Sequence, residues 1–206
     1  TPSAPFDPLF EKGRTWSFGG QLSSSNCIGP IDGWTCTMGP GEIECCTLEE
    51  RFALACSVSE VKDLGNGERA SLVACTSEAE AAMGLEVGGL MQGCWLVTAG
   101  ALTHDPYCTA LDEAKLTALR AAEPLLSLPL TAAEGSLCDE GGEFCTERKL
   151  SETEGRWCLA TDSVAGDAAG ELRCWQRGLG LVQGSAYFSG GTVSELSFIL
   201  EHTAAP

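Results

Sequence analysis

Twelve cysteines, spread from Cys27 to Cys174, restrict the folds open to this chain of 206 residues more than any other feature. Structural zinc sites draw on C-x₂₋₄-C pairs, and the sequence contains none. The adjacent Cys45 and Cys46 suit one tetrahedral ion poorly. The even number therefore predicts structural disulfides formed in an oxidising compartment. A metal or cluster site, and a mixed set that keeps a free thiol, are the alternatives.

The chain is strongly acidic, with 29 Asp and Glu residues against 12 Lys and Arg and a formal net charge of −17. Phosphate backbones and anionic membrane surfaces attract clustered cations, so we expect no nucleic-acid partner. Residues 85–102 form the most apolar stretch, but Glu86 and several glycines interrupt it, and we expect no membrane span. The chain begins at Thr1 without an apolar leader, as expected of a mature exported protein, either lipid-anchored or released.

The clearest hairpin spans residues 50–76, where two alternating runs flank Gly65-Asn66-Gly67. An Asn-Gly turn between alternating runs is a strong hairpin signal. Cys56 and Cys75 fall at opposite positions about this turn, so we predict a disulfide between them.

The last third of the sequence predicts a β-meander, with strands at 156–161, 171–176, 179–188 and 193–201. Cys158 and Cys174 lie opposite each other about Gly166, which predicts a second disulfide. Cys138 and Cys145 flank an acidic segment and are further disulfide candidates.

One helix is expected at 109–123, opened by Thr109 with Asp112 as its capping partner and stopped by Pro124. Further predictions are an extended leader at 1–12, strands at 14–22, 34–38 and 90–98, and an acidic helical turn at 77–83. The predicted fold is therefore mainly β (α+β), an antiparallel sheet, half-barrel or sandwich of hairpins with one packed helix. Residues 13–206 would form a single disulfide-rich domain, with two similar halves, 13–105 and 125–206, as an alternative.

The C-terminal block resembles the corresponding pattern of uncharacterised bacterial exported lipoprotein-like β proteins, among which myxobacterial examples are similar. In those proteins a G-x-G-L-V turn joins the last sheet strands, and the resemblance implies a β fold and an envelope location but no reaction. The matching positions are Arg173, Cys174, Trp175, Gly178, Gly180, Leu181, Val182, Gly184, Ser185, Phe188, Gly190, Gly191, Glu195 and Phe198. The extra cysteines depart from that pattern.

No motif for catalysis or cofactor binding stands out. His104 lies close to Cys108, which allows a Cys–His pair, although a loop histidine beside a disulfide cysteine is the simpler interpretation. His202 is expected to be solvated, and the strained G-x-S-x-G turn of serine hydrolases is absent. We therefore expect no cofactor, no metal and no catalytic residue.

Two groups of residues remain as candidate ligand sites. Asp139, Glu140 and Glu143 could line a calcium loop, but they lack the D-x-D-x-D-G spacing, and a solvated acidic loop is favoured. Trp16, Trp95 and Trp157 could line a concave ligand-binding face. Core anchors would show the same pattern, because each tryptophan begins an extended stretch.

These observations predict a non-catalytic, exported binding or structural domain of the cell envelope or an extracellular structure. Its partner would be another envelope or extracellular protein. The alternatives are a secreted hydrolase that uses carboxylates and a disulfide-stapled inhibitor that presents the loop at 26–40.

Overall fold

The computed structural model describes residues 4–27, 33–38, 44–77, 89–138, 145–163, 168–190 and 194–203, which form one 13-stranded sheet with one α-helix. All strand pairs are antiparallel, so the predicted mainly β fold is confirmed. The strands are β1 (Thr15–Asn26), β2 (Thr35–Met38), β3 (Glu44–Gly65), β4 (Glu68–Ser77), β5 (Gly93–Val97), β6 (Ala101–Asp105), β7 (Leu126–Ser127), β8 (Ala133–Cys138), β9 (Cys145–Thr153), β10 (Arg156–Ser163), β11 (Ala168–Gln176), β12 (Gly180–Gly190) and β13 (Ser194–His202).

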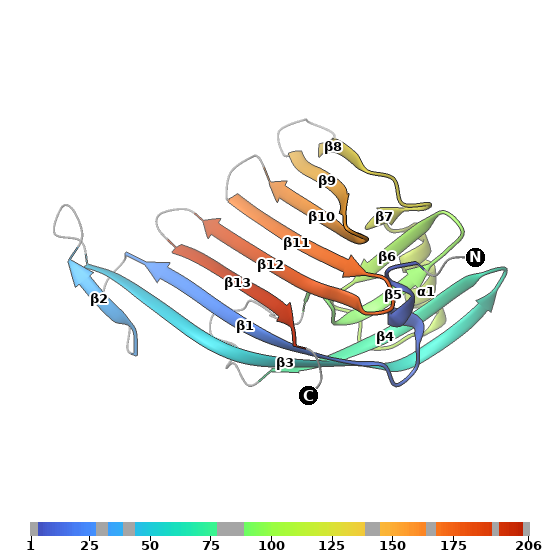
Figure 1. Ribbon diagram of the computed structural model, residues 1–206, viewed down its shortest axis with the longest axis horizontal. Helices are drawn as coiled ribbons and strands as arrows, with labels where there is room; N and C mark the ends of the chain where they lie inside the picture. The colour runs from blue at the N-terminus through green and yellow to red at the C-terminus, as the bar shows by residue number, and fades with distance from the viewer. Residues whose placement is uncertain are drawn as a thin grey trace.

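The strand order places the first and last strands in the middle of the sheet. It runs β7-β6-β5-β4-β3-β1-β13-β12-β11-β10-β9-β8, with β2 paired to β3. The two ends of this order, β7 and β8, are consecutive in the chain and are joined by residues 128–132. Figure 1 shows the sheet curling between these ends, as expected for a large antiparallel sheet that twists. We call the region where β7 and β8 approach each other the seam.

The core lies on the inner face of the curled sheet and follows the period-2 alternation of its strands. Trp16, Phe18 and Leu22 of β1 are buried there, together with Trp95 of β5 and Trp175 of β11. Large aromatic side chains bury much apolar area, so their packing on the inner face contributes strongly to the stability of the fold.

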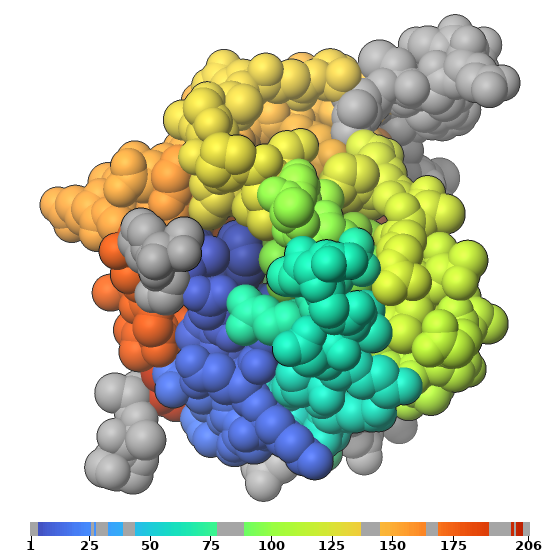
Figure 2. Space-filling model, turned by 90° about the vertical axis from the view of Figure 1, so that its right-hand side faces the viewer, coloured from blue at the N-terminus to red at the C-terminus, as the bar shows by residue number. Residues whose placement is uncertain are grey.

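The structure differs from the predicted extended leader in residues 4–12. Asp7–Phe10 form a short 3-10 helix, η1, and Phe6, Leu9 and Phe10 are buried. In Figure 2 this blue segment lies between the teal β3–β4 hairpin and the orange-red strands of the C-terminal half. Three apolar side chains in this segment outweigh the extended tendency of its prolines, because their burial removes them from water.

Most of the disulfides link neighbouring strands, and Cys94–Cys108 links β5 to the segment between β6 and α1. Cys56–Cys75 and Cys158–Cys174 are confirmed, and each joins residues that lie opposite each other in antiparallel register. The other bonds in the described residues are Cys27–Cys45, Cys36–Cys46 and Cys94–Cys108. Cys145 is also disulfide-bonded, and Cys138 lies opposite it in the register of β8 and β9. These bonds indicate an oxidising, extracellular-type environment.

The helix α1 (Glu113–Ala121) is shorter than the predicted 109–123. Asp112, not Thr109, is its N-cap, and the Asp112 carboxylate accepts a hydrogen bond of 2.8 Å from the Lys115 backbone N–H. Residues 109–111 follow Cys108, which is bonded to β5, and Leu111 is buried there, so the chain turns into the helix only afterwards. Leu116 and Leu119 pack against the face of β5 that points away from the main core.

The remaining predicted elements agree with the structure in type and differ at their ends. The strand expected at 14–22 is longer, the strand expected at 90–98 is shorter, and β6, β7, β8 and β9 were not predicted. The turn Gly65-Asn66-Gly67 is confirmed, with φ of +52° at Asn66 and +82° at Gly67. Of the expected acidic helical turn at 77–83, residues 78–83 lie outside the described residues.

The G-x-G-L-V segment forms the connection between β11 and β12, as the resemblance implied. Gly178 and Gly180 have φ of +76° and +82°, a backbone conformation that favours glycine. A Cβ atom at Gly180 would also lie 3.0 Å from Nε1 of Trp16. In the part of the chain that the structure describes, no helix is both long and apolar enough to cross a membrane.

Candidate functional site

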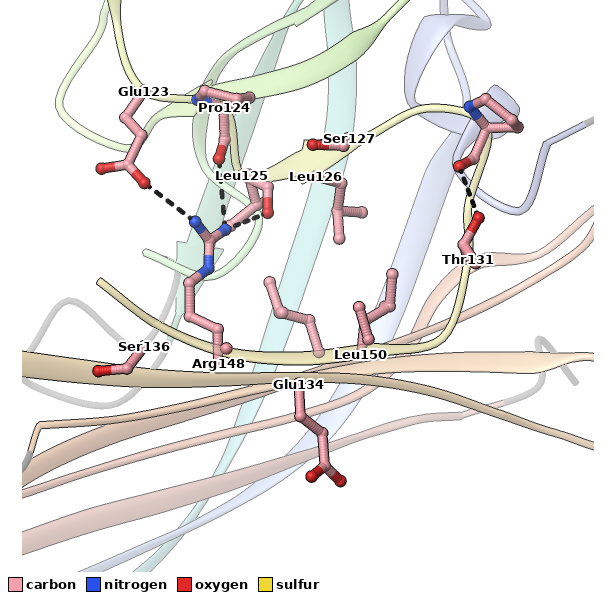
Figure 3. A pocket seen from close by; sticks show the side chains of 14 residues that line it. Glu123, Pro124, Leu125, Leu126, Ser127, Thr131, Glu134, Ser136, Arg148 and Leu150 are labelled. Carbon is pink, nitrogen blue, oxygen red and sulfur yellow. Dashed lines mark hydrogen bonds and ion pairs between the residues drawn. The ribbon is translucent and has the colours of Figure 1, made fainter.

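A cleft of about 440 Å³ lies in the seam. We call it the seam cleft. Its walls come from the segment around β7 on one side and from β8, β9 and β10 on the other (Figure 3). Its lining residues are Glu123, Pro124, Leu125, Leu126, Ser127, Pro129, Thr131, Ala133, Glu134, Gly135, Ser136, Arg148, Leu150 and Leu159.

The floor of the seam cleft is apolar because strand register brings leucines together. Leu159 of β10 lies opposite Leu150 of β9, which lies opposite Ala133 of β8, so these three residues share the inner face. Leu126 of β7 faces this group from the other wall (Figure 3). Leu126 and Leu159 are buried in the main core, whereas Leu150 is half-buried and Ala133 is exposed.

Arg148 bridges the two walls of the seam cleft at one end. Its Nη1 atom lies 3.2 Å from Glu123 Oε1, and its Nη2 atom donates to the backbone carbonyls of Pro124, at 3.3 Å, and Leu125. The planar guanidinium can serve all three acceptors at once, which an ammonium group could not do with the same geometry. Arg148 therefore holds the segment before β7 against β9.

The other charged residues of this region lie on the outer face of the sheet. Glu134 points away from the seam cleft (Figure 3) and forms an ion pair with Lys149 of β9. The hydrogen bond from Lys149 lowers the pKa of the Glu134 carboxyl. These two residues line a second hollow of about 510 Å³, the outer hollow, together with Glu147 and Asp162.

A polar cluster, in which Arg173 is buried and His104 half-buried, connects the two halves of the sheet. His104 of β6 stacks on Trp95 with ring centroids 3.9 Å apart, and its Nε2 atom lies 2.8 Å from the Gln92 carbonyl oxygen. A carbonyl only accepts, so Nε2 carries the proton, and the bare Nδ1 accepts a hydrogen bond of 2.9 Å from Arg173 of β11. Arg173 also donates to Glu171 at 2.7 Å.

Burial, reinforced by the Arg173 charge, lowers the pKa of His104 to about 3. Burial also lowers the pKa of Arg173, opposed by the carboxylate of Glu171. His104 is therefore neutral near pH 7, and both of its ring nitrogens are engaged. The hydrogen bonds of His104 and Arg173 are made within the protein and join β6 to β11, so we assign the cluster a structural role.

The suggested Cys–His pair is not formed, because Cys108 is bonded to Cys94 and carries no thiol. His202, expected to be solvated, is half-buried and packs edge-on against Phe18, with ring centroids 5.8 Å apart. Burial lowers its pKa, and the Arg14 charge adds to this effect.

The three tryptophans proposed to line a ligand face are not gathered at the surface. Trp16 is 2% exposed and donates to the Leu179 carbonyl at 2.6 Å, and Trp95 is fully buried and donates to the Met91 carbonyl at 2.8 Å. Trp157 is half-buried, opposite Trp175 in the register of β10 and β11. Trp16 and Trp95 are core anchors.

The calcium-loop candidates Asp139, Glu140 and Glu143 lie outside the described residues, as does much of the loop suggested for an inhibitor. Within the described ranges, no group of three or more His, Cys, Asp or Glu side chains is placed to hold a metal ion. No sequence pattern predicted the seam cleft or the contacts of Arg148. The apolar residues Leu150 and Leu159 were the one available signal for the seam cleft. They share a face only through the β9–β10 register, which the sequence alone does not give.

Comparison of the chain with family models, with curated proteins and with solved structures gives no match. The function is therefore inferred from the geometry of the seam cleft and its surroundings.

Proposed function

We propose that this chain is an exported, non-catalytic binding domain and that the seam cleft is its ligand site. It would act in the periplasm, on the outer-membrane surface or outside the cell, where another envelope or extracellular protein supplies the ligand. One observation carries the proposal. The seam cleft combines an apolar floor with a rim whose charged side chains, Glu123 and Arg148, form an ion pair with each other.

The arrangement of the carboxyl groups favours binding over hydrolysis. A carboxylate-dependent hydrolase needs two carboxyl groups directed at the same space, one of them with a raised pKa. Glu123 reaches across to Arg148, whereas Glu134 points to the opposite side of the strand. The pKa of Glu134 is lowered, which opposes the role of a general acid at neutral pH.

The disulfides support both the location and the binding role. Cys158–Cys174 joins β10, which lines the seam cleft, to β11, and Cys145 of β9 is also disulfide-bonded, so these bonds brace one wall of the seam cleft. A preformed apolar site loses less conformational entropy on binding than a site that must first order itself.

The proposal is tested with a neutral, environment-sensitive dye titrated against the oxidised protein. We expect saturable binding that weakens by about tenfold or more in Ala133→Trp, because the indole fills the seam cleft beside Leu150. Ala53→Trp, at an exposed position on β3, is the matched control and should bind the dye like the wild type.

Equal dye affinity in Ala133→Trp and Ala53→Trp would show that the dye does not bind in the seam cleft. Turnover of a hydrolase substrate that disappears in Glu123→Gln would overturn the non-catalytic proposal.

A further inference from the structure

The sheet ends at the seam in two edge strands, β7 and β8. Among the described strands, β8 pairs only with β9, and the two-residue β7 pairs only with β6. An edge strand presents backbone N–H and C=O groups that can pair with another chain. Extended peptides bind many proteins in this way, by adding a strand to the sheet.

The N-terminal part of β8 is open to such a strand. Ala133, Glu134 and Gly135 are all exposed, and none of them is a proline or a lysine, the residues that often protect an edge. A Cβ atom at Gly135 would meet nothing within 4 Å. The exposure of these three residues leaves room for a second backbone beside β8.

The two faces beside this edge differ in chemistry. The inner face is the seam cleft, with Leu126, Leu150 and Leu159 on its floor. The outer face is the outer hollow, where three carboxylates, Glu134, Glu147 and Asp162, surround the single lysine Lys149. Arg148 also lines the outer hollow, but its guanidinium is bound to Glu123 and two carbonyls on the inner side.

Side chains of a strand alternate between the two faces of a sheet, so a strand added to β8 would direct every second side chain into the apolar cleft. The intervening side chains would lie over the acidic outer hollow, where lysine or arginine is complementary. The net charge of −17 attracts a basic partner at longer range and repels a second copy of this chain.

We propose that the seam binds an extended segment of an exported partner protein, added as a strand along β8. Apolar side chains of this segment enter the seam cleft, and alternate basic side chains cover the outer hollow. The inference rests on the proposed binding function and names the class of its ligand.

The experiment titrates the oxidised full chain with a synthetic peptide of alternating valine and lysine residues, capped at both ends. One control peptide has the same composition with the valines and lysines in two blocks. The other keeps the alternating sequence and carries N-methyl groups on alternate amides, which removes the backbone donors of one edge. Fluorescence anisotropy gives affinities, and hydrogen exchange locates the binding site.

We expect the alternating peptide to bind at least about tenfold more tightly than either control. Only this peptide has both the alternation of valine and lysine and the free backbone N–H donors. Within residues 133–135, the alternate amides that point away from β9 should gain protection from exchange. Glu147→Lys should weaken binding by about three- to tenfold and reduce its salt dependence. Glu49→Lys, the same charge change at an exposed position on β3, should leave the affinity unchanged.

Equal binding of all three peptides, or protection confined to another part of the sheet, would overturn strand addition. If the neutral dye binds in the seam cleft but the alternating peptide does not bind, the strand proposal fails and the binding function stands. If neither binds, both proposals fail. Association of the chain with itself through protected β8 amides would replace the basic partner with a second copy and overturn the stated ligand class.

Discussion

Two short strands of the same sheet, β5 and β8, differ in nearly every contact that they make. All five residues of β5 are buried, with β4 and β6 on its two edges, the main core on one face and α1 on the other. Residues 133–136 of β8 are exposed, and β9 is the one strand paired with β8 in the described chain. A strand that is covered on every side stabilises the fold, whereas a strand with one open edge is available to a partner.

The strongest test of this contrast is Trp95→Ala in β5. Trp95 is fully buried, stacks on His104 and donates a hydrogen bond to the Met91 carbonyl. We expect the free energy of unfolding to fall by about 4–5 kcal/mol, because the change removes a large side chain and leaves a cavity. Denaturant unfolding measures it. Trp157→Ala, at a half-buried position on β10, is the control and should cost clearly less; equal costs would contradict the contrast.

Acid should lower the free energy of unfolding by a smaller amount, through the polar cluster of His104 and Arg173 that joins β6 to β11. The pKa of His104 is about 3 in the folded protein, against an ordinary value of 6.5. Between these values the unfolded chain binds a proton that the folded chain does not, so stability falls as the pH drops below 6.5. The loss should reach about 3 kcal/mol by pH 4.

Unfolding measured from pH 7 to pH 4 in the wild type and in His104→Gln isolates this contribution. The glutamine variant should lose less stability over the same interval, because its amide does not titrate. His202→Gln, at the other histidine, should retain most of the wild-type slope, since His202 is only half-buried. Identical slopes in wild type and His104→Gln would show that the cluster does not control the acid response.

The disulfide between β10 and β11 should contribute somewhat less to the free energy of unfolding than the change in pH does. Replacing both Cys158 and Cys174 with alanine opens a loop closed by a bond across 16 residues of sequence separation. We expect a loss of about 2–3 kcal/mol, chiefly because the unfolded chain gains conformational freedom. Thermal unfolding of the double variant measures this, and an unchanged midpoint would mean that strand pairing alone fixes this hairpin.

Short-range signals were sufficient for the β3–β4 and β10–β11 hairpins. The Asn66-Gly67 turn and the cysteines placed symmetrically about it predicted both the β3–β4 pairing and its disulfide. The burial of residues 6–10 could not be predicted in the same way. It depends on the space left at one end of the curled sheet, which no local pattern records.

The seam cleft was unpredictable for a related reason. Arg148 contacts carbonyls 23 and 24 residues earlier in the chain, and these contacts exist only because the sheet curls until β7 meets β9. An arginine in an alternating, polar segment looks like a solvated residue in the sequence. Its role depends on the spatial proximity of β7 and β9, which lie near opposite ends of the strand order.

The smallest expected change in stability is also the most informative about the seam. Arg148→Lys keeps the positive charge beside Glu123 but removes the planar guanidinium, whose Nη2 atom donates to the Pro124 and Leu125 carbonyls. We expect a loss of only about 1 kcal/mol in unfolding free energy, because the residue lies at the rim of the fold and water can satisfy the carbonyls. Dye affinity in the seam cleft should fall by about threefold, since the wall before β7 is no longer held in place. Arg51→Lys, at an exposed position on β3, controls for the substitution itself. A large loss of stability without any loss of affinity would reverse the contrast between β5 and β8, because it would make the seam part of the structural framework and leave ligand binding to another surface.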